Sequence, residues 1–154
     1  MIDPAGARAI PRSRLLKLVS MPGVGEAVLS LGGSTFLVKS MAADFFDKKL
    51  VEQFQQCYRI QMQFKGFRRA ILSTLRNRML ESFIEEYRQV GRLGTPTLLL
   101  WGRNDNTVPL WHSDELRTAI PQAEFHVIDD CSHIPHYEKP EETNALLQEF
   151  LRNA

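Results

Sequence analysis

The apolar positions divide the chain into two regions with different periodicity. Between about residues 12 and 87, apolar side chains recur every three or four residues, in short segments separated by Gly or Pro. This spacing is typical of amphipathic helices. One segment, DKKLVEQFQQCYRIQMQF, ends at Gly66, and another, STFLVKSMAADFF, begins at Ser34. The pattern predicts a layer of short helices that packs against another part of the molecule.

The last third of the chain predicts alternating strands and helices. GTPTLLLWG (94–102) is a consecutive apolar run of strand length, as expected for a strand of a parallel sheet that is buried on both faces. A helix is predicted over 110–120, a second strand over 123–129, and a last helix that Pro140 begins. The order strand, helix, strand, helix indicates an α/β fold with parallel strands.

The first residues, MIDPAG, resemble the tail of a strand followed by a turn. Ile2 precedes a break at Asp3-Pro4. Strands usually run for five or six residues, and only two or three positions precede this break. We therefore expect the chain to begin inside a structural element, residues 1–6 being the remnant of a core strand.

Composition and charge narrow the function classes. The chain has 154 residues, 44% hydrophobic and 24% charged, with a formal net charge of +1. These values are typical of a soluble globular domain and predict no nucleic-acid partner. No apolar run is long enough to span a membrane, and the N-terminus does not resemble a signal peptide. Cys57 and Cys131 do not make a disulfide framework, so we expect a reducing, cytoplasmic environment.

Two side chains stand where an α/β sheet carries chemistry. Asp105 follows the first predicted strand in WGRNDNTVP, and His133 follows the second in DDCSH. Ligands bind beyond the carboxyl ends of parallel strands, so these two loops could meet. A carboxylate that binds one imidazole nitrogen fixes the tautomer and leaves the other nitrogen as a base. Taken alone, Asp105 is better interpreted as a turn residue and His133 could be a loop residue; the strand before Asp105, Pro109 after it and the pairing of the two residues favour the catalytic interpretation.

Other polar residues carry weaker signals. A metal site built from His126, His133, His136, Asp129 and Asp130 is disfavoured, because the spacing is loose for zinc and His126 would lie on a strand. We predict no metal and no cofactor. Cys131 is interpreted as a small packing residue. His112 falls on a helix expected to be half exposed, with solvent as its partner.

The segment from Thr95 to Leu151 resembles the C-terminal end of enzymes with the α/β-hydrolase fold. The matching features are the WG-x-x-D-x-x-x-P loop, the D-x-x-H loop after a short strand, and the E-x-P-E entry to the last helix. The resemblance implies that Asp105 is the acid and His133 the base of a catalytic triad. It also implies that residues 7–90 form a helical cap, as in esterase- and lipase-like members, and that residues 91–154 form the C-terminal part of the core.

The sequence departs from this family in one large respect. The nucleophile of the fold sits in a G-x-S-x-G elbow upstream of the cap, and this sequence contains no such motif. LGGST superficially resembles it, but Ser34 follows two glycines in a helix break and not a strand. We therefore expect no nucleophile here: part of a serine hydrolase for ester- or lipid-type substrates, inactive alone. The alternatives are a fragment of a C–C, epoxide or haloalkane hydrolase, and a non-catalytic interaction module.

The predicted sheet also has consequences for partners. Strands buried on both faces need neighbours, and a missing half-sheet would leave an open edge and bare apolar surface. We expect self-association, or association with a missing N-terminal half, unless the chain is simply a truncated piece of a longer enzyme. Once completed, it would act on a small apolar ester-like substrate.

Overall fold

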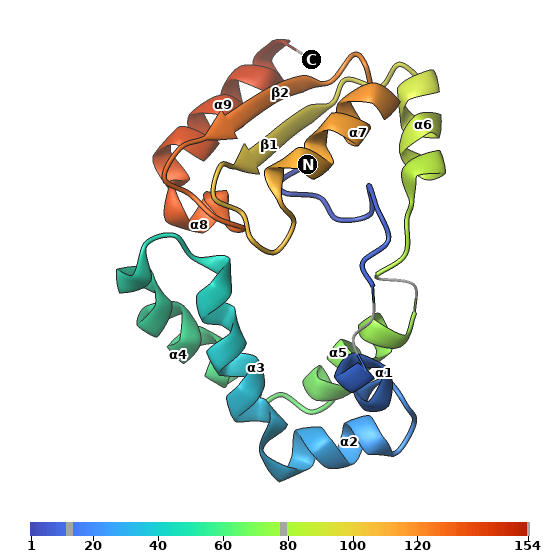
Figure 1. Cartoon of the computed structure of the whole chain (residues 1–154). Helices are drawn as coiled ribbons and strands as arrows, with labels where there is room; N and C mark the ends of the chain where they lie inside the picture. The colour runs from blue at the N-terminus through green and yellow to red at the C-terminus, as the bar shows by residue number, and fades with distance from the viewer. Residues whose placement is uncertain (12–13, 78–79, 154) are drawn as a thin grey trace.

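The computed structural model describes residues 1–11, 14–77 and 80–153. A short parallel sheet with its helices forms one part of the molecule, and a group of helices forms the other (Figure 1). The elements, in chain order, are α1 (Arg14–Val19), α2 (Val24–Val28), η1 (Leu29–Gly33), α3 (Ser34–Ser40), η2 (Met41–Asp44), η3 (Lys48–Leu50), α4 (Val51–Gln61), α5 (Phe67–Arg76), α6 (Ile84–Arg92), β1 (Leu98–Gly102), η4 (Leu110–His112), α7 (Ser113–Ala119), β2 (Glu124–Ile128), α8 (Pro135–Glu138) and α9 (Pro140–Asn153).

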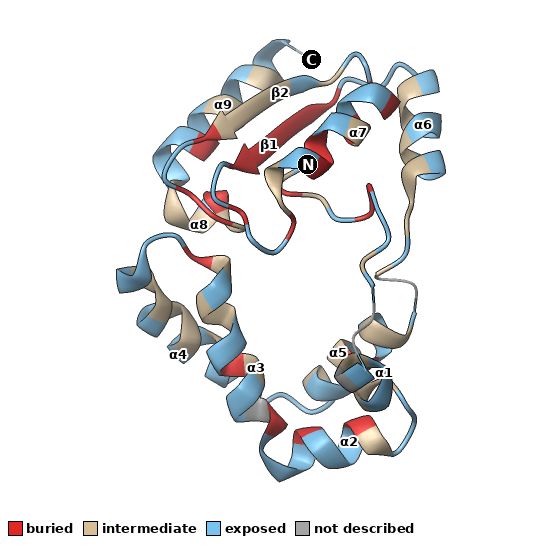
Figure 2. Cartoon of the chain, in the orientation of Figure 1, coloured by how far each residue is buried: buried red, intermediate tan, exposed pale blue. Residues whose placement is uncertain are grey.

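The sheet confirms the predicted fold class. β1 and β2 pair in parallel, in a register that runs from Leu98 opposite Glu124 to Gly102 opposite Ile128. The opposite edge of β1 carries the start of the chain, where Ile2 forms a parallel bridge to Leu100. β1 therefore lies between two neighbours and is buried along its whole length, whereas β2 is exposed at its start (Figure 2). A strand with neighbours on both edges and helices on both faces needs consecutive apolar residues, which explains LLLW.

Alternation along β1 sends side chains to two separate layers. Leu99 and Trp101 pack into one core cluster with Leu116 of α7, and Tyr87 of α6 lies against it. α9 contacts the strand from the other side of the sheet (Figure 1). The indole N–H of Trp101 donates to the carbonyl of Val108 at 2.9 Å, so the same side chain fills the core and fixes the loop after its own strand.

Between residues 14 and 77 the described chain is almost wholly helical, in agreement with the predicted helical layer. The segment around Leu31 and Gly32 is a kink and not a continuous helix, because Gly32 has a φ of 126°. Ser34 therefore begins α3 directly after a kinked helical turn. A nucleophile elbow joins a strand to a helix, whereas Ser34 follows a helical turn; that Ser34 is not a nucleophile stays a prediction.

One ion-pair network ties the helices of this layer together. Arg76 of α5 binds both carboxylate oxygens of Glu26, at 2.7 and 2.9 Å, and also donates to the carbonyl of Ser20 at 2.9 Å. The hydrogen bond from Arg76 lowers the pKa of Glu26 to about 2. Helices of five to ten residues have little stability alone, so such contacts and their shared core hold them in place. Within the described residues, no helix is long and apolar enough to cross a membrane.

Candidate functional site

Asp105 lies in the turn after β1, and both oxygens of its buried carboxylate accept hydrogen bonds. Oδ1 accepts from the backbone N–H groups of Thr107 at 2.7 Å and Val108 at 2.8 Å. Oδ2 lies 2.8 Å from Nδ1 of His133. Asp105 therefore organises its turn, as its sequence context suggested, and also contacts the histidine. Asp105 can make both sets of contacts because each uses a different oxygen of the same carboxylate, and its catalytic role stays a prediction.

The loops after β1 and β2 are held against each other by main-chain contacts. The N–H of Asn104 donates to the carbonyl of Cys131 at 2.9 Å, and the Ser132 hydroxyl donates to the carbonyl of Asn104 at 3.2 Å. A Cβ on Gly102 would stand 1.9 Å from the carbonyl oxygen of Ser132. Only glycine lets the two backbones approach this closely. The parallel register thus brings the two loops to one edge of the sheet, and Gly102 lets them touch.

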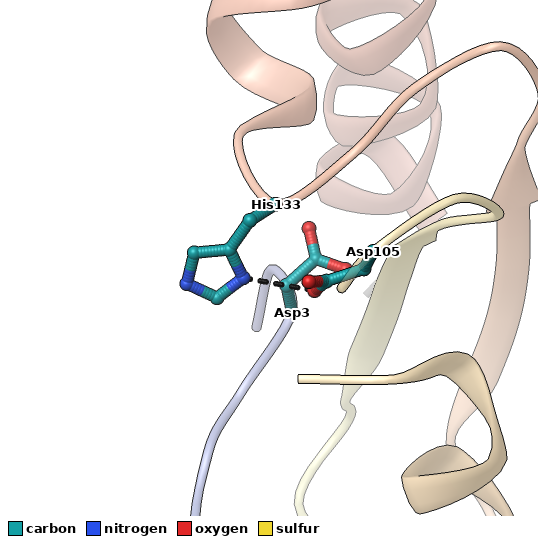
Figure 3. A group of neighbouring side chains, drawn as sticks. All are labelled: Asp3, Asp105 and His133. Atoms are coloured by element: carbon teal, nitrogen blue, oxygen red, sulfur yellow. Dashed lines mark hydrogen bonds and ion pairs between the residues drawn. The ribbon is translucent and has the colours of Figure 1, made fainter. Parts of the chain in front are cut away.

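His133 presents its second ring nitrogen away from Asp105 (Figure 3). Nδ1 faces the carboxylate, so that position carries a proton, and Nε2 has no hydrogen-bond partner among the described residues. Burial alone would lower the pKa of the imidazole. The hydrogen bond and charge of Asp105, together with the charges of Asp3 and Asp44, outweigh burial and raise that pKa. The arrangement can hold a proton at Nδ1 and accept a second one at Nε2.

A second acid, Asp3, completes a group of three side chains with Asp105 and His133, and sequence analysis treated it only as part of a turn. Asp3 is 3% exposed, and its Oδ1 accepts from the N–H of Gly102 at 2.9 Å. Asp3, Asp105 and His133 offer polar atoms that all lie within 4.8 Å of one another (Figure 3). Burial raises the pKa of Asp3 to about 8. The rule that selected Asp105 and His133, a polar residue directly after a strand, would also have found Asp3.

The helical layer contacts the two loops through the segment around Asp44. The carbonyl of Asp44 accepts from the N–H of His133 at 3.1 Å, and its carboxylate accepts from the Thr107 hydroxyl at 2.6 Å. The rings of Phe45 and Tyr137 pack edge to face, with centroids 5.9 Å apart. Sequence analysis did not identify these contacts, because they join segments that are far apart in the chain.

Glu138 makes the strongest polar link across the same boundary. Its Oε2 accepts from the N–H groups of Phe46 at 2.7 Å and Asp47 at 3.0 Å, while Oε1 accepts from the N–H of Ser132 at 2.7 Å. One carboxylate therefore joins the helical layer to the residue directly before His133. Charged acceptors make the stronger kind of hydrogen bond.

The other residues considered as metal ligands do not lie together in the structure. His126 bonds Glu124 at 2.6 Å, Asp129 pairs with Arg103, and His136 is exposed. Among the described residues, the one group of three or more potential metal ligands is Asp3, Asp105 and His133. These three are already arranged as a hydrogen-bonded pair with a further carboxyl group beside it.

His112 and Cys131, which lie outside this cluster, are both buried. The prediction that His112 faces solvent was wrong: its side chain is buried, and burial followed by the charge of Arg8 lowers its pKa. It lies at the junction of η4 and α7, where the helix turns its buried face to the core. Cys131 is fully buried, and burial together with the charge of Glu138 raises the pKa of its thiol, which fits a packing residue.

Comparison with known proteins relates the chain to hydrolases of the α/β-hydrolase fold. Residues 32–140 match the model of the alpha/beta hydrolase fold family. The chain is 41% identical over 64 residues to a 2-hydroxy-6-oxo-6-phenylhexa-2,4-dienoate hydrolase of Comamonas testosteroni, a stretch that covers 42% of this chain and 22% of that relative.

Two solved structures show the fold with equal similarity. The meta-cleavage product hydrolase of Pseudomonas fluorescens IP01 superposes with a TM-score of 0.70 at 24% identity, over 99% of this chain and 54% of that one. A thermophilic esterase from Thermogutta terrifontis also gives 0.70, at 22% identity over 99% and 54%. The chain thus spans about half the length of these enzymes.

Proposed function

We propose that this chain, which belongs to the α/β-hydrolase fold family, supplies the acid and the base of a catalytic triad. The main support for this proposal is the 2.8 Å contact between Nδ1 of His133 and Oδ2 of Asp105, which leaves Nε2 without a hydrogen-bond partner among the described residues. In this proposal Nε2 takes the proton of a nucleophile and returns it to the leaving group. Asp105 holds the tautomer and stabilises the imidazolium that forms.

The nucleophile in this proposal lies outside the 154 residues. The sequence contains no G-x-S-x-G, and the chain spans about half the length of the solved enzymes. We propose that a segment carrying the elbow and the oxyanion donors joins the sheet beside residues 1–2, the neighbour of β1 on its outer edge. The division into a strand remnant (1–6), a cap (7–90) and a C-terminal core (91–154) belongs to the same proposal, and so does self-association as another way to cover this edge.

For the reaction class, we propose hydrolysis of a carbon–carbon bond in a 2-hydroxy-6-oxo-dienoate. The fold does not discriminate, because an esterase and a meta-cleavage product hydrolase superpose equally well. The sequence relationship to a dienoate hydrolase supports this class over the ester- or lipid-type substrate that the sequence alone favoured.

The proposed chemistry uses the His133–Asp105 pair at two points. The proton of the 2-hydroxyl group first moves to C5, which gives the 2-keto form. Hydroxide derived from water then adds to the ketone carbon C6, directly or after an acyl intermediate on the elbow nucleophile. The bond between C5 and C6 breaks, and the 2-oxygen takes up a proton. The products are a carboxylic acid and a 2-hydroxydienoate. The electron pair left on C5 is stabilised by conjugation with the 2-keto form of the chain. A base is needed for the addition and an acid for the protonation, and one histidine can serve both in turn.

The test compares two proteins on two substrates. The reading frame upstream of the Met1 codon is sequenced for a G-x-S-x-G, and the extended chain is purified beside the 154-residue chain. Both are assayed with 2-hydroxy-6-oxo-6-phenylhexa-2,4-dienoate, by loss of its absorbance, and with p-nitrophenyl acetate.

We expect the extended chain to hydrolyse the dienoate in preference to the ester, and the 154-residue chain to show no turnover above its His133→Ala variant. In the extended chain His133→Ala should reduce kcat by about 10⁴-fold or more. His136→Ala, at a neighbouring exposed position, is the matched control and should change kcat by less than about twofold. An upstream frame without an elbow, or an extended chain indifferent to His133→Ala, would favour a non-catalytic module.

A further inference from the structure

The inference concerns the buried carboxyl group of Asp3, which the proposed mechanism does not use. The chain start runs beside β1: the N–H of Leu100 donates to the carbonyl of Met1, and the N–H of Asp3 donates to the carbonyl of Leu100, both at 2.9 Å. Asp3 then leaves the strand with a φ of 40°, in the left-handed region. This turn directs its side chain to Gly102, at the edge of the sheet that carries Asp105 and His133.

The two carboxyl groups have unequal sets of donors. Asp105 receives the N–H groups of Thr107 and Val108 and faces Nδ1 of His133, so its ionised form is well stabilised. Asp3 receives only the N–H of Gly102. Its second oxygen, Oδ2, is buried, and no donor group of the described residues reaches it. An ionised oxygen in that position would be buried without compensation, which is costly.

A single proton resolves this conflict. Two carboxyl groups in close contact inside a protein do not both ionise readily, because like charges repel strongly where water is excluded. Polar atoms of Asp3, Asp105 and His133 lie within 4.8 Å of one another, and the charge of Asp105 raises the pKa of Asp3. Since Asp105 has the better donors, the proton belongs on Asp3, whose hydroxyl then donates to Asp105. The otherwise unpartnered oxygen of Asp3 thereby gains a partner.

We propose that Asp3 is a positioning residue that holds a proton at neutral pH, donates it in a hydrogen bond to Asp105, and keeps the acid cluster beside His133 at a single negative charge. It touches neither a substrate nor the nucleophile. Its action is on Asp105, and through Asp105 on the basicity of His133. The inference rests on the proposed function only for its effect on catalysis, and the proton sharing itself can be tested without any turnover.

Other charged groups surround this cluster at its borders. Besides burial, the charges of Glu138 and Asp3 both raise the pKa of the Cys131 thiol, and the thiol contacts Glu138. The charge of Asp44, from the helical layer, raises the pKa of His133. The charge of Asp105 also acts on His112, which lies in η4. Burial raises the pKa of Asp3 to about 8, the charge of Asp105 adds to this effect, and the Gly102 N–H opposes it. A second negative charge should therefore form beside His133 only above about pH 8.

The test is a side-chain NMR titration of the 154-residue chain between pH 4 and 10. In the unmodified protein, the carboxyl carbon of Asp3 should titrate in the alkaline range. The ring signals of His133 should show a second step when Asp3 ionises. Asp3→Asn keeps a neutral donor of the same size, so it should remove this second step and leave the hydrogen bond between His133 and Asp105.

Asp130→Asn is the control, because Asp130 is exposed and precedes His133 in the same loop. It should leave both steps unchanged. The inference is overturned if the Asp3 carboxyl carbon titrates near the ordinary aspartate range, or if His133 shows the same titration curve with Asp3→Asn as without it. The carboxyl measurement needs no substitution, so the result stands even if Asp3→Asn does not fold. Either outcome is independent of whether the extended chain hydrolyses a dienoate.

Discussion

Removal of the Glu138 carboxylate should separate the helical layer from the loop that carries His133. Glu138 accepts three backbone hydrogen bonds, of which the one from Ser132 serves a buried residue, while Phe46 and Asp47 are exposed. In Glu138→Ala the Ser132 N–H loses its partner, which costs about 1–3 kcal/mol, whereas water replaces most of what the exposed groups lose. We expect a total loss of about 3 kcal/mol in the free energy of unfolding.

Glu138→Gln should give a smaller loss of about 1.5 kcal/mol, because the amide keeps one acceptor oxygen but presents a donor on its other side. That oxygen can serve Ser132 or the two exposed N–H groups, but not both. The Ser132 N–H is buried and cannot bind water instead, so we expect the amide oxygen to accept its hydrogen bond. Amide hydrogen exchange at Phe46 and Asp47 should then accelerate more than exchange at Ser132.

Urea unfolding of the 154-residue chain measures these differences. With an m-value of about 2 kcal/mol/M, Glu138→Ala should lower the midpoint by about 1.5 M at unchanged m. Glu141→Ala is the matched control, since Glu141 is an exposed acid in the first turn of α9 and should cost less than about 1 kcal/mol. If Glu138→Ala and Glu141→Ala shift the midpoint equally, the carboxylate does not connect the two parts of the molecule.

Two further substitutions test the site itself. Gly102→Ala would place a methyl carbon 1.9 Å from a backbone oxygen, so it should cost more than about 3 kcal/mol in thermal unfolding; Gly94→Ala, whose Cβ would meet nothing within 4 Å, should cost only the strain of its positive φ, about 1 kcal/mol. Asp105→Asn removes the charge that raises the pKa of His133, so that pKa should fall in an NMR titration. The stability that protonated His133 gains from Asp105 is complete below pH 6.5 and is lost as pH rises through the raised pKa, so the difference in urea midpoint between the two proteins should shrink over that range; a constant difference would contradict this account.

The sequence predicted the part of the fold that local pattern controls. Four consecutive apolar residues from Leu98 to Trp101 indicated a doubly buried strand, and β1 is buried throughout. Residues placed after successive strands were expected to meet, and His133 and Asp105 do so at 2.8 Å. Their catalytic role stays a prediction, because contact alone does not identify a reaction.

The residues that sequence analysis missed depend on contacts between distant segments. Asp3 follows the predicted strand remnant, so the rule applied to Asp105 and His133 could have selected it, but only the pairing of Ile2 with β1 places it beside those two residues. Glu138 stands in a short helix where an acid looks unremarkable, and its role comes from Phe46, about ninety positions away. His112 was assigned to solvent because a helix pattern gives its faces but not which partner covers each one.

These non-local contacts determine how basic His133 is. Its ring is influenced by Asp105 from the loop after β1, by Asp3 from the start of the chain, and by Asp44 from the helical layer. A triad motif read from the sequence names only the first of the three. If Asp3 is neutral, Asp105 and Asp44 are the two carboxylates whose charges raise the pKa of His133. The helical layer therefore contributes to the basicity of His133 through Asp44, whose carbonyl and carboxylate contact the loops after β2 and β1.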